Sequence, residues 1–119
     1  MSTPTGRAVD DATASALTAL ALGRTDVLGQ AEDERSRWDS GLDPRGFALA
    51  KIAALVAIDA PPASYVWQVG AALDAGVTPR DILGVLTAVA PQVGLVRVVA
   101  AAPEIMVALD LELPAGLDG

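Results

Sequence analysis

The sequence predicts an all-α protein of about six helices, and three observations support this prediction. Alanine-rich apolar segments alternate with short breaks, and several segments open on a capping residue followed by proline and close at glycine. No two-residue hairpin signal such as Asn-Gly is present. Aromatic residues make up only 3% of the chain, so the core must consist of Ala, Val, Leu and Ile side chains.

The N-terminal part starts with a polar segment, residues 1–10, that we expect to be a disordered tail. Residues 12–22 are mostly Ala and Leu with some Thr and Ser, a composition that suits a helix. Gly23 is placed to end this helix, because glycine readily adopts the left-handed backbone conformation found after helix C-termini.

A second helical segment is expected to follow Thr25 or Asp26. It carries the charged stretch AEDERSRW at residues 31–38, in which Glu and Arg stand at helical pairing distances. Such charges are more typical of a solvated helix face than of a functional cluster. Trp38 is expected to anchor this helix to the rest of the protein.

The next helix follows Gly41 and has a clear start. Asp43 is a suitable N-cap and Pro44 suits the first helical position. The apolar residues that follow cover more than one helix face, and Lys51 is the only charge in the central part. A helix that is apolar nearly all round is expected to be buried on several sides.

The connector DAPPAS then leads into a helix over residues 62–75, which Gly76 ends. Thr78 caps the following helix, Pro79 opens it, and Asp81 stands where the acid of a capping box belongs. This step from helix through turn to helix is the most sharply defined local feature of the sequence.

That helix is expected to stop before Pro91, because proline cannot donate the backbone hydrogen bond that a helix interior needs. The last helical region is predicted to start near Leu95, to be interrupted or kinked at Pro103 and to fade by Leu113. Residues 114–119 are expected to form a loose tail.

The apolar run in this region has two other interpretations. The spacing in residues 82–90 would also permit a buried strand, but the caps, the prolines and the alanine content favour a helix. The uncharged run of residues 82–96 contains Pro91, Gln92 and two glycines, so it is too short and too broken to span a bilayer. We therefore predict a single all-α domain over residues 11–113.

The bulk composition excludes several classes of function. A net charge of −7 argues against binding to nucleic acid or to an anionic membrane surface. The chain has neither cysteine nor histidine, which removes disulfides, thiol redox chemistry and the commonest metal ligands. We therefore expect no cofactor and no metal, and the polar N-terminus makes the cytoplasm the expected location. A short chain with 52% hydrophobic residues is often completed by oligomerisation.

Three segments stand in a recognisable order and spacing: LDPRGFALAKIAALVA at residues 42–57, VGAALDAGVTPRDILGVL at 69–86 and APQVGLVRVVAAAPEI at 90–105. Over rather more than half of its length the chain resembles the carboxymuconolactone decarboxylase family, which includes the alkylhydroperoxidase D-like proteins. The helix–Gly–Val–Thr–Pro–helix step is the most characteristic part. The resemblance implies the alkylhydroperoxidase D-like fold, built on an antiparallel helical hairpin, and homo-oligomers that are often trimers or hexamers.

Redox members of this family carry Cys-x-x-Cys, a histidine four residues later and a glutamate upstream. Such a set suits peroxide chemistry, because one thiolate attacks, the second thiol resolves, and His and Glu relay protons. Aligning backwards from VGAALDAG places Pro61 and Ser64 at the two cysteine positions and Gln68 at the histidine position, which decarboxylase members also occupy with histidine.

Aligning forwards from LDP shifts the register by one residue. The cysteine positions then fall on Ala60 and Ala63, and the upstream glutamate position falls near Ala48. Neither register contains a thiol or an imidazole. The sequence therefore predicts that the protein is not a thiol peroxidase, and no residue is identified as catalytic.

Four candidate ligand-binding residues, Ser64, Tyr65, Trp67 and Gln68, lie on the first two turns of one predicted helix. Ser64 and Gln68 are four residues apart and share a face. Gln68 is able to bind a ligand carbonyl or carboxylate, or else a backbone group or a neighbouring subunit, and Ser64 is more typical of a cap than of a nucleophile. The two aromatic residues suit a pocket wall, core filling or a subunit contact.

Arg97 is the fifth candidate, because it stands alone in an apolar stretch. A charge there needs a partner or an interface, and Asp59, Asp74 or the carboxylate of a ligand would each serve. A structural salt bridge is the simplest of these interpretations.

Two hypotheses follow from these residues. The favoured one is a catalytically silent oligomer that acts as a scaffold or partner subunit. The alternative is a divergent cofactor-free enzyme or binder of a small organic acid or lactone-like compound, with a pocket near Tyr65, Trp67, Gln68 and Arg97 and rate enhancement through positioning and hydrogen bonding. An enclosed cavity with convergent polar groups would favour the alternative, and a site filled by side chains would count against it.

Overall fold

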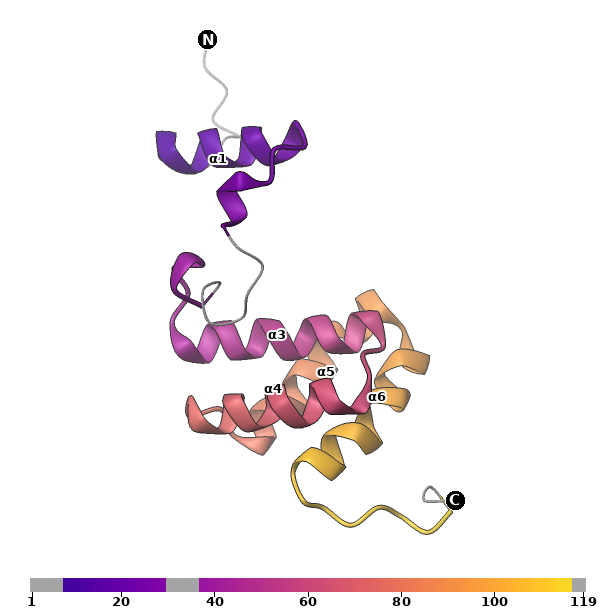
Figure 1. Cartoon of the computed structure of the whole chain (residues 1–119). Helices are drawn as coiled ribbons and strands as arrows, with labels where there is room; N and C mark the ends of the chain where they lie inside the picture. The colour runs from indigo at the N-terminus through magenta and orange to yellow at the C-terminus, as the bar shows by residue number, and fades with distance from the viewer. Residues whose placement is uncertain (1–7, 30–36, 117–119) are drawn as a thin grey trace. The chain divides into compact units, whose positions relative to one another are not determined.

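The computed structural model describes residues 8–29 and 37–116, and every regular element in these ranges is a helix (Figure 1). The chain divides into two compact units, Met1–Gly41 and Leu42–Gly119. The first unit contains α1 (Asp11–Ala21) and the short 3-10 helix η1 (Asp26–Leu28), and the second contains α3 (Pro44–Ile58), α4 (Pro62–Asp74), α5 (Pro79–Val93) and α6 (Leu95–Ala108). The all-α prediction is confirmed, whereas the extent of a single domain over residues 11–113 and its two tails stays a prediction.

Helix α1 forms where the composition predicts it. The carboxylate of Asp10 accepts hydrogen bonds from the backbone N–H of Thr13 at 3.2 Å and from its hydroxyl at 2.6 Å. Gly23 follows the helix with a φ of 82°. None of the residues of α1 or η1 is buried.

Most of the charged stretch predicted to form a solvated helix lies outside the described residues. Its last residue, Trp38, is exposed, and the guanidinium carbon of Arg37 lies 5.8 Å from the centroid of the indole ring. The anchor expected for Trp38 would be a contact with the second unit, and it stays a prediction. A cation over the ring face keeps the indole beside a well-hydrated charge, which favours an exposed position.

The helix starts of the second unit follow the sequence closely. The Asp43 carboxylate accepts a hydrogen bond from the N–H of Gly46 at 2.6 Å, and Pro44 is the first residue of α3. The capping box before α5 is complete. The Asp81 N–H donates to the Thr78 hydroxyl at 3.1 Å, and the Thr78 N–H donates to the Asp81 carboxylate at 2.9 Å.

The expected stop of α5 before Pro91 is wrong, and α6 is not interrupted at Pro103, because both prolines lie inside helices. A kink at Pro103 stays a prediction. Helix α5 continues through Pro91 to Val93, and α6 continues through Pro103 to Ala108. Pro91 stands in the last turn of α5 and costs the helix one backbone bond, the one that an N–H at this position would donate to the Thr87 carbonyl. Pro103 lies mid-helix between the buried residues Ala101 and Ile105, so packing offsets the missing backbone bond.

Helices α3 and α4 run antiparallel and side by side, joined by a connector of a few residues (Figure 1). Helix α6 packs on α4 and α3, and α5 packs on α3 and α6. Twelve buried apolar residues form the core between these helices: Ala48, Ile52, Val56, Ala60, Tyr65, Val69, Ala72, Val77, Ile82, Leu86, Ala101 and Ile105.

The core is small in area because Ala and Val supply seven of its twelve members. Several larger apolar side chains of the same four helices remain exposed to solvent. Over the residues that the structure describes, no helix combines the length and apolar character that crossing a membrane requires.

Candidate functional site

A solvent-open hollow of about 500 Å³ lies where the end of α3 meets the start of α6. Two polar side chains and a set of small or apolar residues line it: Asp59, Val93, Gly94, Leu95, Val96, Arg97 and Ala100. Both chain reversals that border the hollow contain a residue with a positive φ angle. Asp59 ends α3 with a φ of 53°, and Gly94 separates α5 from α6 with a φ of 89°.

The start of α6 has no side-chain cap, because its N-cap residue is Gly94. The first backbone bond into the helix runs from the N–H of Val98 to the carbonyl of Gly94 at 3.4 Å. The N–H groups of the first turn therefore have no intrahelical partner, and they carry the positive end of the helix dipole. Arg97 adds a full positive charge to the same turn.

Arg97 and Asp59 both line this hollow, yet they form no ion pair with each other. Within the described ranges the one salt bridge shorter than 4.0 Å joins Arg45 and Asp81 at 3.0 Å. The structural salt bridge expected for Arg97, with Asp59 or Asp74, is therefore not formed. The side chain of Arg97 is exposed, so water can hydrate its charge without a protein partner.

Tyr65 lies next to this region but belongs to the core. Its side chain is 1% exposed, and its hydroxyl has no hydrogen-bond partner in the part of the chain that the structure describes. Burial raises the pKa of the Tyr65 hydroxyl, and the negative charges of Asp59 and Glu104 raise it further. The phenol therefore stays protonated at neutral pH, as a buried donor close to two carboxylates.

The four candidates at the start of α4 differ in burial, and the pocket expected around them stays a prediction. Trp67 is 72% exposed and points its bulk towards solvent, whereas Tyr65 fills the core. Ser64 and Gln68 are partly buried, and Gln68 has an interaction partner. Ser64 is not the cap of α4, since Pro61 occupies that position without a side-chain hydrogen bond. Of the five candidates, the hollow collects Arg97 alone.

Sequence reasoning named Asp59 only as a possible partner of Arg97 and did not place it in a site. The signals that identify the hollow are a residue with a left-handed backbone before Ala-Pro-Pro and a glycine separating two apolar helices. Both signals are local, but the proximity of Asp59 to the start of α6 depends on the packing of distant segments.

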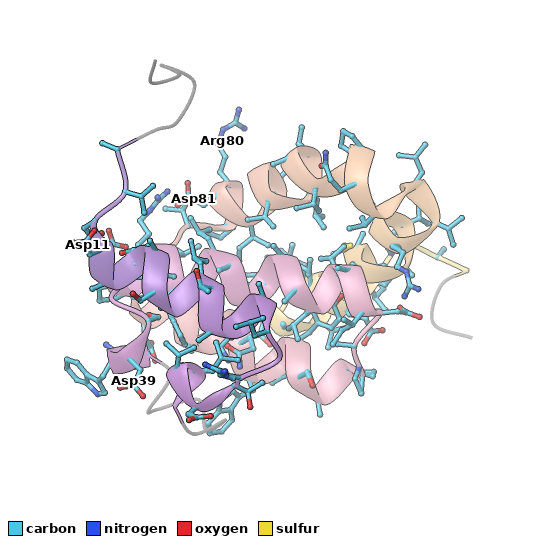
Figure 2. The ribbon with its side chains drawn as sticks, turned by 90° about the horizontal axis from the view of Figure 1, so that it is seen from above. Asp11, Asp39, Arg80 and Asp81 are labelled. Carbon is cyan, nitrogen blue, oxygen red and sulfur yellow. The ribbon has the colours of Figure 1, made fainter. Side chains whose placement is uncertain are left out.

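A second hollow of about 500 Å³ lies beside the start of α5 and has a structural explanation. Arg45 and Asp81 line it and pair with each other, and Thr78 forms the capping box described above. The backbone hydrogen bond with Thr78 is the main cause of the lowered pKa of Asp81. The side-chain hydrogen bond with Thr78 and the charge of Arg45 lower this pKa further. Arg80 projects away from the helices next to Asp81 (Figure 2).

Metal ligation finds no support in the described geometry. Across residues 8–29 and 37–116, no group of three or more Asp, Glu, His or Cys side chains stands close enough together to hold a metal ion. The polar groups that do converge are the guanidinium of Arg97, the uncapped N–H groups of α6 and the carboxylate of Asp59. This arrangement is suited to binding charged groups and offers no nucleophile.

Comparisons with known proteins agree with this helical architecture. A search of curated proteins and of solved structures found no match to the chain. The model of the carboxymuconolactone decarboxylase family matches residues 30–105, which is well over half of the chain and includes α3, α4, α5 and most of α6. The chain belongs to the carboxymuconolactone decarboxylase family.

Proposed function

We propose that this protein is a homo-oligomeric member of its family that has no thiol redox chemistry and acts through assembly, as a scaffold or partner subunit. The observation that carries the proposal is a second apolar stripe on α6. Val96, Val99 and Val107 are 84%, 69% and 50% exposed, although Ala101 and Ile105 on the other side of the same helix are buried.

The spacing of these valines defines one continuous helix face. Positions 96, 99 and 107 follow the three- and four-residue steps that bring side chains into line on a helix, and Ala100 and Pro103 lie between them. A helix that is apolar on two opposite sides is typical of one buried from both sides. A second copy of the chain is the partner that we propose for the outer side.

Helix α4 supports the same assembly with a second group of exposed apolar side chains. Val66, Trp67 and Leu73 all face solvent, and α4 packs directly against α6. Tryptophan is enriched among the few residues that contribute most of the binding free energy at the centre of interfaces, and exposed apolar patches often mark such interfaces. We therefore assign Trp67 to the proposed interface rather than to a ligand pocket.

Catalytic silence is supported by the residues at the family's reactive positions. In one register these are Pro61, Ser64 and Gln68, and in the other the cysteine positions hold Ala60 and Ala63. None of them can form a thiolate or act as a general base at neutral pH.

The assembly is tested by native mass spectrometry of the wild-type chain and of Val99→Asp. We expect a trimer or hexamer for the wild type and dissociation to smaller species for the variant, because each copy would bury a charge without a partner. Leu83→Asp provides the matched control, since Leu83 is an exposed apolar residue on α5, away from the stripe. A monomeric wild type, or an unchanged mass for Val99→Asp, contradicts the proposed assembly.

The absence of redox function is tested by incubating the metal-free protein with a hydroperoxide and a dithiol reductant. We expect consumption of peroxide no faster than in buffer, because no thiol is present to carry the reaction. Turnover that depends on protein concentration would show that another group performs the chemistry.

One observation favours a second candidate function. The protein would then be a small-molecule binder or a divergent cofactor-free enzyme, acting on a small organic acid or lactone-like compound. Among the described residues Arg97 has no acidic partner within 4.0 Å, and it lines a hollow, where it is able to receive a carboxylate. Saturable binding of a small carboxylic acid that Arg97→Gln abolishes would favour this candidate over pure assembly.

A further inference from the structure

The hollow between α3 and α6 is lined by two side chains of opposite charge, Asp59 and Arg97, and by several apolar residues. We propose that it binds a small zwitterion, a molecule that carries both a carboxylate and an ammonium group on an aliphatic frame. The site consists of residues of one chain, but Val96 and Ala100 belong both to its lining and to the helix face of the proposed assembly, so the hollow borders that interface.

The carboxylate of the ligand is assigned to the α6 side. Arg97 has no acidic partner within the described ranges, and its planar guanidinium can donate two parallel hydrogen bonds to a carboxylate. The N–H groups of the first turn of α6 point towards the N-terminal end of the helix. They have no side-chain cap, because the N-cap residue is Gly94. The side chain and the helix dipole therefore favour the same sign of ligand charge.

The ammonium group of the ligand is assigned to the α3 side. Asp59 supplies a carboxylate at the C-terminal end of α3, where the helix dipole also favours a positive charge. Asp59 lies close enough to the buried Tyr65 hydroxyl to raise its pKa, as does Glu104, so the region beside Asp59 carries negative potential. Side-chain charge and helix dipole again agree, with a sign opposite to that on the α6 side.

The apolar part of the lining fits an aliphatic frame. Val93, Leu95, Val96 and Ala100 provide apolar contacts, and the hollow measures about 500 Å³. The two side-chain charges are more than 4.0 Å apart at their closest, so they do not neutralise each other. A ligand with both charges can contact both sides at once, whereas a ligand with a single charge leaves one side unpaired.

The test is a binding titration of the full-length protein by NMR, with two probes that separate their charges by different lengths, L-leucine and 5-aminopentanoate. Pentanoate and pentylamine are the matched controls for 5-aminopentanoate, because each lacks one of its two charges. We expect at least one zwitterion to bind saturably, and each single-charge control to bind about tenfold more weakly or worse, as the loss of a charge-assisted contact implies.

Two variants assign the ends of the ligand. Arg97→Gln and Asp59→Asn each remove one charge, and Asn is tolerated at the left-handed backbone conformation of residue 59. We expect each variant to weaken zwitterion binding about tenfold while the helix content stays that of the wild type. Arg80→Gln and Asp74→Asn change the net charge by the same amounts outside the hollow, and we expect them to leave binding unchanged.

Three results would overturn the inference. The first is a failure of both zwitterions to bind at tens of millimolar. The second is binding of pentanoate as tight as that of 5-aminopentanoate and unaffected by Asp59→Asn, which would identify a simple anion site. The third is an equal loss of binding in Arg80→Gln or Asp74→Asn, which would show that net charge alone is responsible. Native mass spectrometry of each variant separates any of these from a failure of assembly.

Discussion

At the scale of single residues, Tyr65, the single tyrosine of the chain, combines an apolar ring and a polar hydroxyl in the core. Its ring fills the core, as a large apolar group should, but its hydroxyl is buried without a partner among the described residues. An unpaired buried hydroxyl costs free energy, so the folded state contains a polar group that it does not need for stability.

Replacing Tyr65 with Phe removes that hydroxyl and keeps the ring. We expect the free energy of unfolding to rise by about 1 kcal/mol, measured by urea titration at neutral pH. A fall in stability would show instead that the hydroxyl makes a stabilising contact, such as a bound water or ligand.

The raised pKa of Tyr65 also predicts a dependence of stability on pH. The unfolded chain has a tyrosine pKa of about 10, and the folded value is higher because burial and the charges of Asp59 and Glu104 disfavour the phenolate. The stability associated with the protonated Tyr65 hydroxyl is therefore fully present below the unfolded-state pKa of about 10. It is lost as the pH rises through the pKa of the folded state. Absorbance of the phenolate should show late ionisation in the wild type, and Tyr65→Phe should flatten the loss of stability at high pH.

At the scale of a single helix, the capping box of α5 is the clearest stabilising device. Thr78 and Asp81 satisfy each other's backbone N–H groups, and Asp81 also pairs with Arg45. The ion pair is substantially exposed, so the capping bonds contribute most of the stabilisation.

Thr78→Ala removes one of these capping bonds, and we expect it to lower the free energy of unfolding by about 1 kcal/mol. Thr87→Ala is the matched control. Thr87 is exposed within the same helix, its hydroxyl bonds the Leu83 carbonyl, and Ala is the better helix former there, so stability should change by less than about 0.5 kcal/mol. Equal losses in both variants would show that helix propensity, and not capping, sets the stability of α5.

At the scale of the whole molecule, the buried apolar residues are unevenly distributed along the chain. Every buried apolar residue in the described chain lies in the unit Leu42–Gly119, whereas α1 and η1 bury none. The buried core that the structure describes therefore belongs to the second unit. The cytoplasmic location expected from the sequence stays a prediction.

A fragment of residues 42–119 should therefore fold without the first unit. We expect its circular dichroism to show a helical protein, with a urea midpoint close to that of the full-length chain, because it keeps every buried apolar residue that the structure describes. A fragment that is unfolded, or that unfolds without cooperativity, would show that the first unit contributes to the core.

The sequence by itself determined the helices and their starts, because Asp43, Pro44, Thr78 and Asp81 act on backbone groups within a few residues of themselves. It also excluded thiol chemistry and identified the family, since both depend on residue types and their spacing. Tertiary structure alone decided the continuity of α6 through Pro103, where packing offsets a lost backbone bond. It also decided that Trp67 faces solvent and that Asp59 and Arg97 border one hollow, because contacts between segments far apart in sequence leave no local pattern.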